Sequence, residues 1–293
     1  MRSSLSRLAT KTVATLMAVA CLNLAQAGAR ADVMADIAER GILRVGTTLN
    51  IPWAMRDSAG EPMGFEIDNA ARLATDLGVE LELVELPFDA LLDALEAGTV
   101  DVVAAGLSIT PERALRAAFS DPYMIGDVSV VVRVADLDRY DSLMSLDDPA
   151  VTAATVAGTT TELAIARSLP SVSLGSYATV SEAIQAFLDG EVTALVAETP
   201  IPELLLAENQ EVFAILPDPL YTSAQAFAIA RGEHTFRTFL DNWIVASEIG
   251  GTLESARFYW FGGRDWLPRL DRPLFDIPIG PAEPAEEPAV DAD

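Results

Sequence analysis

The chain has 293 residues and is 51% hydrophobic, so it is long enough for two modest domains with separate cores and too apolar for bulk disorder. Its 44 acidic residues against 19 lysines and arginines give a net charge of −25, which argues against partners such as nucleic acid or an anionic membrane. A single cysteine, Cys21, and a single histidine, His234, argue against a disulfide framework, a cysteine–histidine catalytic pair and the common kind of zinc site.

The first 31 residues have the layout of a secretory signal peptide. An apolar run at 12–25, too short to cross a bilayer, is followed by small residues and preceded by three cations, Arg2, Arg7 and Lys11. We expect residues 1–31 to be removed by cleavage before Asp32, or alternatively before Gly28. Cys21 raises the alternative of a lipid anchor, but the apolar run continues beyond it, which favours soluble export. The remaining chain has no cysteine and no lysine, which excludes thiolate and lysine Schiff-base chemistry.

The next segment alternates strand and helix patterns. In chain order we expect a strand at 42–45, a helix at 66–77 ended by Gly78, a strand at 80–86, a helix around 91–95 that Asp89 caps and Gly98 ends, and a strand at 100–105. The order βαβαβ predicts a parallel sheet covered by helices.

The same order recurs later in the chain. We expect a strand at 152–156 running into a turn at Gly158, a helix through Leu169, a strand at 172–177, a helix from about Ser181 to Gly190, and a strand at 192–197. Two apolar segments, 128–132 and 226–230, can link the two units as a hinge, and a last helical segment carries Phe236, Phe239, Trp243 and Ile244. Residues 278–293 are rich in proline, alanine and acids, and we expect them to be disordered.

The turn after the third strand is the most informative stretch. It places Ser108, Thr110 and Arg113 in one small volume, and hydroxyls, backbone N–H groups and a guanidinium are the groups that hold a carboxylate. The alternative for Arg113 is a salt bridge on a helix surface. For Thr159–Thr161, at the start of a later helix, the alternative is capping, which is compatible with ligand binding.

Short motifs throughout the chain resemble one family, the type 3 extracellular solute-binding proteins of amino-acid ABC transporters. The motifs span roughly 43–261 in the family's order: Leu43-Arg44-Val45-Gly46-Thr47, Gly64-Phe65-Glu66-Ile67-Asp68, Phe88-Asp89-Ala90-Leu91, Asp101-Val102-Val103, Ser108-Ile109-Thr110-Pro111-Glu112-Arg113, Phe119-Ser120-Asp121-Pro122-Tyr123, Ala157-Gly158-Thr159-Thr160 and Glu198-Thr199-Pro200.

The resemblance implies a periplasmic-binding-protein type II fold, with two α/β lobes joined by a two-strand hinge. Lobe 1 would comprise 32–124 and 227–277, and lobe 2 would comprise 125–226 with a hinge strand at each end. It implies a monomeric periplasmic protein that closes around an amino acid or related zwitterion and delivers it to an ABC permease. No cofactor and no metal are implied.

The resemblance also implies roles for particular residues. Arg113 would pair with the ligand α-carboxylate, supported by Ser108 and the Gly106 backbone from the same lobe. Thr159 and Thr160 would approach that carboxylate from the opposite lobe, and Glu198 would take the α-ammonium. Phe88 and Trp53, otherwise ordinary core residues, would lie beside the ligand side chain. The physical logic agrees, because a zwitterion leaving water needs hydrogen-bonded partners for both charges.

Several positions depart from the family pattern. Glu198 stands where an aspartate is common, Ile51 where an aromatic residue is common, and an acid often found near Thr48 is absent. These changes leave side-chain specificity open and make a strongly cationic ligand less favoured, while the carboxylate grip is unaffected.

An enzyme is the main alternative, because proteins on this fold that resemble cyclohexadienyl dehydratase eliminate water and carbon dioxide from prephenate-like acids. That chemistry needs a general acid, which the resemblance places three residues after Glu198, where this chain has Ile201. Isoleucine cannot transfer a proton, and Glu203 would need a changed backbone to substitute, so binding is favoured. A periplasmic sensor that docks to a receptor is a third reading with the same binding step.

Overall fold

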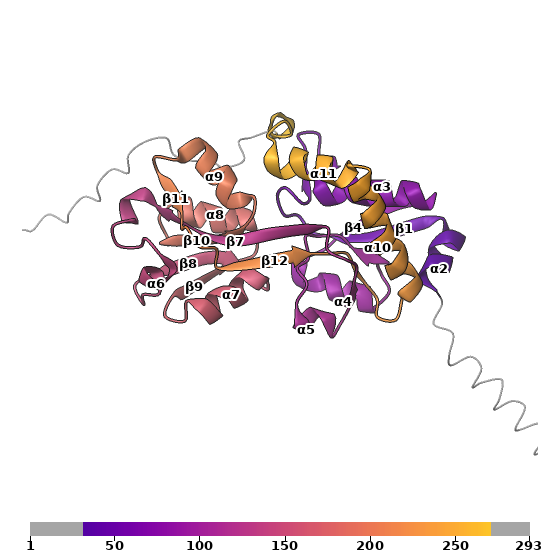
Figure 1. Cartoon of the computed structure of the whole chain (residues 1–293), viewed down its shortest axis with the longest axis horizontal. Helices are drawn as coiled ribbons and strands as arrows, with labels where there is room; N and C mark the ends of the chain where they lie inside the picture. The colour runs from indigo at the N-terminus through magenta and orange to yellow at the C-terminus, as the bar shows by residue number, and fades with distance from the viewer. Residues whose placement is uncertain (1–31, 271–293) are drawn as a thin grey trace, which may run out of the picture.

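Strands and helices alternate along the chain and assemble into two α/β lobes that lie side by side along the long axis of the molecule (Figure 1). The computed structural model describes residues 32–270. The predicted signal peptide at 1–31 and the predicted disordered tail at 278–293 lie outside the described residues. None of the helices within 32–270 combines the length and apolar character needed to cross a membrane.

Lobe 1 has a mixed sheet whose strand order, within the described residues, is β4-β1-β5-β13-β6. Its elements are α2 (Val33–Arg40), β1 (Ile42–Thr47), β2 (Met55–Arg56), β3 (Pro62–Met63), α3 (Phe65–Leu77), β4 (Glu80–Glu85), η1 (Phe88–Ala90), α4 (Leu91–Glu96), β5 (Val102–Val103), α5 (Pro111–Ala114), β6 (Ala118–Phe119) and β13 (Ala228–Ile229). The predicted βαβαβ order is confirmed, and β1 pairs in parallel with β4 and β5. The predicted parallel sheet is confirmed for these three strands, and β13, which returns from the other lobe, extends the sheet by pairing antiparallel with β5 and β6.

Local sequence explains where α3 ends but not where α4 begins. Phe65, Ala70 and Leu73 are buried at helical spacing along α3, and Gly78 ends the helix in the left-handed conformation with φ of 71°. The prediction that Asp89 caps the next helix is wrong. Asp89 lies inside the short 3₁₀ turn η1, and α4 begins after Ala90 without a side-chain cap.

Lobe 2 repeats the plan with a larger sheet, ordered β11-β7-β10-β8-β9 within the described residues, with β12 also paired to β7. Its elements are β7 (Met124–Arg133), η2 (Val134–Asp136), α6 (Leu143–Leu146), β8 (Thr152–Val156), α7 (Thr160–Ser168), β9 (Ser173–Tyr177), α8 (Val180–Leu188), β10 (Ala194–Glu198), α9 (Ile201–Asn209), β11 (Phe213–Ile215) and β12 (Tyr221–Gln225). The start of α8 is fixed by a capping box in which Thr179 and Glu182 satisfy each other's backbone N–H groups.

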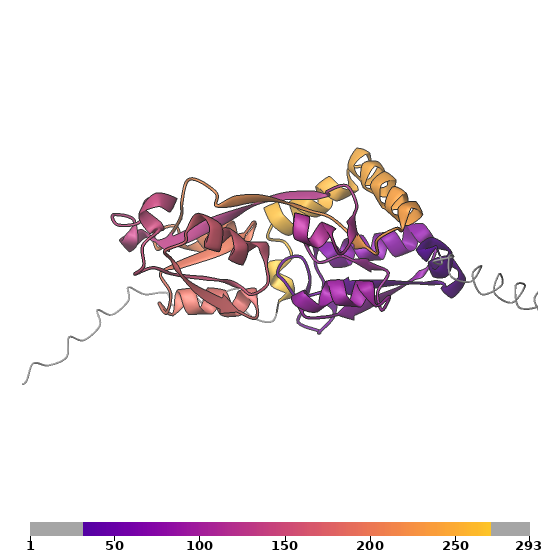
Figure 2. The same ribbon diagram turned by 90° about the horizontal axis from the view of Figure 1, so that it is seen from below.

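Two long segments connect the lobes. β7 and β12 pair antiparallel from Val128 opposite Tyr221 to Met124 opposite Gln225, and two perpendicular views show them running together between the lobes (Figures 1 and 2). The linker expected at 128–132 is displaced: these residues lie mostly in the second half of β7 and pair with β10 inside the lobe 2 sheet, whereas the stretch of β7 paired with β12 is 124–128. The other expected linker, 226–230, follows β12 and contains β13. The two connections therefore form a paired ribbon, which is the geometry of a hinge.

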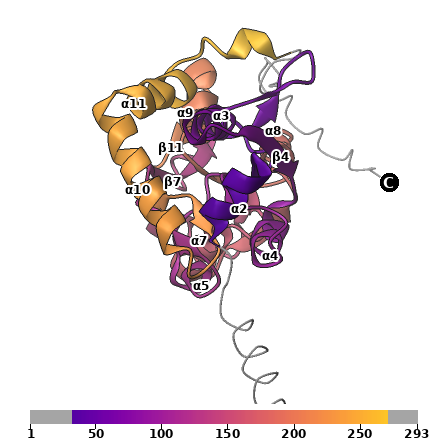
Figure 3. The same ribbon diagram turned by 90° about the vertical axis from the view of Figure 1, so that its right-hand side faces the viewer.

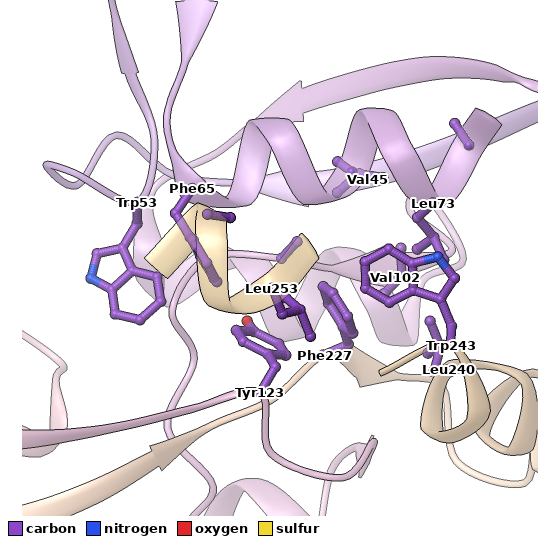
Figure 4. Packing of buried hydrophobic residues seen from close by; sticks show 14 of the residues in the cluster. Val45, Trp53, Phe65, Leu73, Val102, Tyr123, Phe227, Leu240, Trp243 and Leu253 are labelled. Atoms are coloured by element: carbon purple, nitrogen blue, oxygen red, sulfur yellow. The ribbon is translucent and has the colours of Figure 1, made fainter. Parts of the chain in front are cut away.

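The C-terminal helices return to lobe 1. α10 (His234–Ile249) and α11 (Thr252–Arg257) lie along one side of that lobe, followed by η3 (Phe258–Gly262) and η4 (Leu267–Arg269) (Figure 3). Trp243 of α10 and Leu253 of α11 join Phe65, Tyr123 and Phe227 in the main apolar cluster of lobe 1 (Figure 4). The cluster also includes Val45 of β1 and Val102 of β5, so it packs directly against the strands of the lobe 1 sheet.

Candidate functional site

A cavity of about 620 Å³ lies between the two lobes, and both contribute to its walls. Its volume falls within the roughly 300–1,000 Å³ of small-molecule sites. The lining includes all but one of the ligand-binding residues predicted from the sequence: Trp53, Phe88, Gly106, Ser108, Thr159, Thr160 and Glu198. Residues separated by more than a hundred positions in the chain thus meet in one hollow.

Ser108 lies where the two lobes touch. Its side chain is only 3% exposed, and its Oγ lies 3.4 Å from Oγ1 of Thr160 in the opposite lobe. The neighbouring backbone is tied to the hinge, because the N–H of Ile109 donates to the carbonyl of Ala224 and the N–H of Ala226 donates to the carbonyl of Leu107. The predicted hydroxyl turn therefore faces lobe 2 and is fixed to β12.

Arg113, the remaining predicted residue, does not line the cavity itself but supports two residues that do. Its Nη1 donates to the carbonyl oxygen of Ser108 at 2.9 Å, and its guanidinium carbon lies 5.2 Å from the centroid of the Phe88 ring. Burial lowers the pKa of Arg113, while the charge of Glu198 opposes that shift. The described residues hold no carboxylate in a salt bridge with Arg113, so the alternative of a surface ion pair does not describe its position.

Gly106 occupies a place that no larger residue fits. Its φ is +61°, and a Cβ built on it would lie 2.7 Å from the indole ring of Trp53. The N–H of Gly106 donates to Oε1 of Glu66 at 2.7 Å, so it is engaged within lobe 1. The N–H expected to support the ligand carboxylate is therefore already taken, and the carbonyl oxygen of Gly106, which has no partner among the described residues, can only accept a hydrogen bond.

Glu198 ends β10 at the side of the cavity opposite Phe88 and is held by β12. Its Oε1 accepts hydrogen bonds from Oγ of Ser223 and Nε2 of Gln225. Burial raises the pKa of Glu198 to about 7, against the opposing influence of Ser223, Arg113 and Gln225. Sequence reasoning missed Ser223 and Gln225 because no strand was expected at 221–225; once β12 is formed, their alternate spacing puts both side chains on its buried face.

Glu66 supports the cavity wall from behind Gly106, and sequence reasoning missed this contact. It is 1% exposed at the start of α3, and its Oε1 accepts from Gly106 and, at 2.5 Å, from the hydroxyl of Tyr123. Its Oε2 has no partner among the described residues. Burial raises the pKa of Glu66 to about 7, although both hydrogen bonds act in the opposite direction. An acid within the apolar face of an expected helix was the signal for a buried carboxyl.

The threonine turn of lobe 2 presents the start of α7 to the cavity. Thr159, Thr160 and Thr161 all line it, and the first N–H groups of a helix lack partners within the helix. The alternative of a capping side chain is wrong for Thr159, whose Oγ1 donates instead to the carbonyl of Val156 at 2.7 Å. The turn therefore directs helix N–H groups and hydroxyls towards Ser108.

Trp53 serves the core and the cavity at the same time. It is 2% exposed, and its ring makes edge contacts with Phe65 and Phe261 at centroid distances of 5.7 and 4.8 Å. Its indole nitrogen lies on the side of the ring away from the core cluster (Figure 4). Both the core role and the ligand-side position considered for Trp53 are compatible with this placement.

Known proteins resemble this chain along most of its length. The family model for bacterial extracellular solute-binding proteins, family 3, matches residues 43–263. A cyclohexadienyl dehydratase of Pseudomonas aeruginosa is 27% identical over 249 residues, covering 84% of this chain and 93% of that protein.

Two crystal structures have the same fold. An ancestral amino acid-binding protein described as a precursor of cyclohexadienyl dehydratase is 32% identical, with a TM-score of 0.72 over 79% of this chain and 100% of that one. An ABC-transporter binding component from Wolinella succinogenes, complexed with lysine, is 29% identical, with a TM-score of 0.75 over 78% of this chain and 99% of that one. The chain belongs to the family 3 bacterial extracellular solute-binding proteins.

Proposed function

We propose that the protein binds an amino acid, or a closely related zwitterion, by closing its lobes around it, and delivers it in the periplasm to an ABC import permease. The observation that carries the proposal is a carboxylate in the cavity wall of lobe 2, facing a hydroxyl turn of lobe 1 that has a guanidinium directly behind it. Arg113 supports the Ser108 turn on lobe 1, and Glu198 ends a strand of lobe 2. Family membership and the related structures named for amino-acid binding and ABC transport support the same reading.

The carboxylate end of such a ligand would lie between Ser108 and the start of α7. The Ser108 hydroxyl and the Thr160 hydroxyl are already 3.4 Å apart, and the N-terminus of α7 opens on the same space. Helix N-termini and guanidinium groups both stabilise carboxylates. Arg113, hydrogen-bonded to the Ser108 carbonyl and stacked on Phe88, would add its remaining N–H groups from behind this turn.

The ammonium end would meet Glu198. Ser223 and Gln225 both bond Oε1, which leaves Oε2 without a hydrogen bond from the described residues. An ammonium group at Oε2 would stabilise the ionised form and offset the burial that raises the pKa of this carboxyl.

Contacts across the cleft support a closing motion. Leu204 of α9 packs into the apolar cluster of lobe 1, and Arg167 of lobe 2 lies 3.7 Å from Glu112 of lobe 1. A ligand that touches both lobes binds the closed arrangement better than the open one and shifts the population towards it.

A thermal-shift screen against the amino acids tests the proposal. A ligand at about a hundred times its dissociation constant adds about 2.7 kcal/mol to the free energy of unfolding, which is readily seen. Arg113→Ala should abolish the response. Arg116→Ala, which removes a guanidinium bonded to Asp93 and Glu96 at an exposed site, is the matched control and should keep it. No response to any amino acid in the wild-type protein would contradict the proposal.

The dehydratase reading remains the second candidate, because a full-length relative is named as that enzyme and Glu198 places a carboxyl with a pKa of about 7 in the cavity. Against it, Ile201 lines the cavity where the resemblance requires a proton-transferring glutamate, and its side chain is 4% exposed. We therefore infer a binding protein rather than an enzyme. Turnover of prephenate by the purified protein, lost in Glu198→Gln, would reverse this order.

A further inference from the structure

The cavity wall that remains after the two charged ends of the ligand are placed is mostly apolar, although it also includes five neutral polar residues, Thr48, Asn50, Thr155, Thr161 and Thr179. On lobe 2 its apolar part is formed by Ile201, Leu195 and Ala183, all buried, with Val180 beside them. On lobe 1 it is formed by Ile51 and Leu86. These side chains offer contact area and no hydrogen bonds, and such a wall stabilises an apolar group by removing its surface from water.

The acids that line the cavity are poorly placed to hold a cationic side chain. Glu198 is committed to the ammonium and hydrogen-bonded by the hinge strand. Glu85 is exposed and already paired with Arg56 at 2.6 Å. Asp89 is exposed as well, so a cation at either position would remain in water, where an ion pair contributes little.

An acidic side chain is disfavoured for the opposite reason. None of the described residues that line the cavity is a lysine, an arginine or a histidine. Arg113 lies directly behind Ser108 and is taken by the α-carboxylate. A second carboxylate would face the apolar wall and Glu198 without a cationic partner among the lining residues, and burying an unpaired charge is costly.

Resting on the proposed function, we propose that the ligand is an α-amino acid with a large neutral apolar side chain, aromatic or branched aliphatic, which packs against Ile201, Leu195 and Ile51. Phe88 adds an aromatic surface at the edge of this wall, with Arg113 stacked on it. The Wolinella succinogenes relative binds lysine, but we do not assume the same ligand for this chain. The buried part of the cavity in this chain holds no carboxylate besides Glu198.

Isothermal titration calorimetry of the wild-type protein with phenylalanine, leucine, alanine, arginine and glutamate tests the inference. We expect phenylalanine or leucine to bind at least tenfold more tightly than each of the other three. In Ile201→Ala the preference for the large apolar ligand over alanine should shrink several-fold. That ratio is measured within one variant, so a general loss of stability does not move it.

Asp89→Asn is the matched variant for the rival ligand class. It should leave the affinity for phenylalanine and leucine unchanged. If arginine, alanine or glutamate binds as tightly as phenylalanine and leucine, the inference is overturned while the proposed function stands. A loss of arginine affinity in Asp89→Asn would then identify Asp89 as the partner of the cation. If none of the five amino acids binds, the proposed function fails for these ligands and the inference fails with it.

Discussion

The buried carboxyl of Glu66 gives the protein an unusual dependence of stability on pH. Its pKa lies at about 7 in the folded protein, against 4.5 in an unfolded chain, because burial disfavours the charged form. The folded protein therefore keeps this proton to higher pH than the unfolded chain does. Its contribution to stability is present at low pH and is lost as the pH rises from about 4.5 to 7.

The size of the effect follows from the shift. Each unit of pKa difference corresponds to about 1.4 kcal/mol, so Glu66 lowers the free energy of unfolding by about 3 kcal/mol across its titration, of which roughly 2 kcal/mol falls between pH 5 and pH 8. Carboxyls with lowered pKa, such as Asp57 and Asp148, finish titrating below this window. The chain has a single histidine, so few other groups titrate there besides Glu198.

Urea unfolding of wild type and Glu66→Gln at pH 5, 6, 7 and 8 measures this contribution. Glutamine keeps an oxygen for Gly106 and Tyr123 but carries no charge, so the variant should lose about 2 kcal/mol less stability between pH 5 and pH 8 than wild type does. Glu39→Gln, at an exposed position on α2, should show the wild-type slope. A wild-type slope in Glu66→Gln would refute the assignment of a buried, titrating carboxyl at this position.

Three further outcomes follow from individual contacts. In urea unfolding, Gly106→Ala should lower the free energy of unfolding by about 2–4 kcal/mol, because the added methyl group meets Trp53 and the residue has a positive φ. Gly60 also has a positive φ, but a Cβ built on it has nothing within 4 Å, so Gly60→Ala should lower the free energy of unfolding by only about 1 kcal/mol. The amino-acid affinity of the wild-type protein, measured by calorimetry, should fall as the pH drops below about 7, where Glu198 takes up a proton. Glu198→Gln should bind weakly at every pH. A wild-type affinity independent of pH would contradict the ammonium contact. Asp101→Asn should lower the free energy of unfolding by about 2 kcal/mol, because Asp101 is 5% exposed and pairs with Arg40 and Arg44. An unchanged midpoint in thermal or urea unfolding would rule out a stabilising role for these ion pairs.

Local patterns in the sequence predict the elements that are stabilised locally. The helix at 66–77, the strand at 80–86 and the repeat of strand and helix in lobe 2 all appear close to their expected positions, because periodic apolar faces and glycine ends decide them. The expected strand at 100–105 is reduced to two paired residues, and β12 was not expected at all. Both depend on partners far away in the chain, which a local pattern does not contain.

The residues of the site divide in the same way, into those that local patterns predict and those that depend on distant partners. Ser108, Thr160 and Glu198 follow strands or begin helices, and parallel strand ends meet at one edge, so their convergence could be predicted. Glu66, Ser223 and Gln225 act through tertiary contacts, to Gly106 in one case and to Glu198 in the other. Their spacing marks them as unusual, but only the packing of α3 and β12 shows what they hold.

The most direct measurement compares the tightest-binding amino acid with two analogues of it, the amine that lacks the carboxylate and the acid that lacks the amino group, by calorimetry at pH 8. We expect both analogues to bind wild type at least a hundredfold more weakly, because each leaves one buried charge, at Arg113 or at Glu198, without its partner. In Arg113→Ala the affinities for the amino acid and for the amine should differ far less than they do in wild type. Equal affinity of wild type for the amino acid and either analogue would contradict recognition of both poles across the cleft.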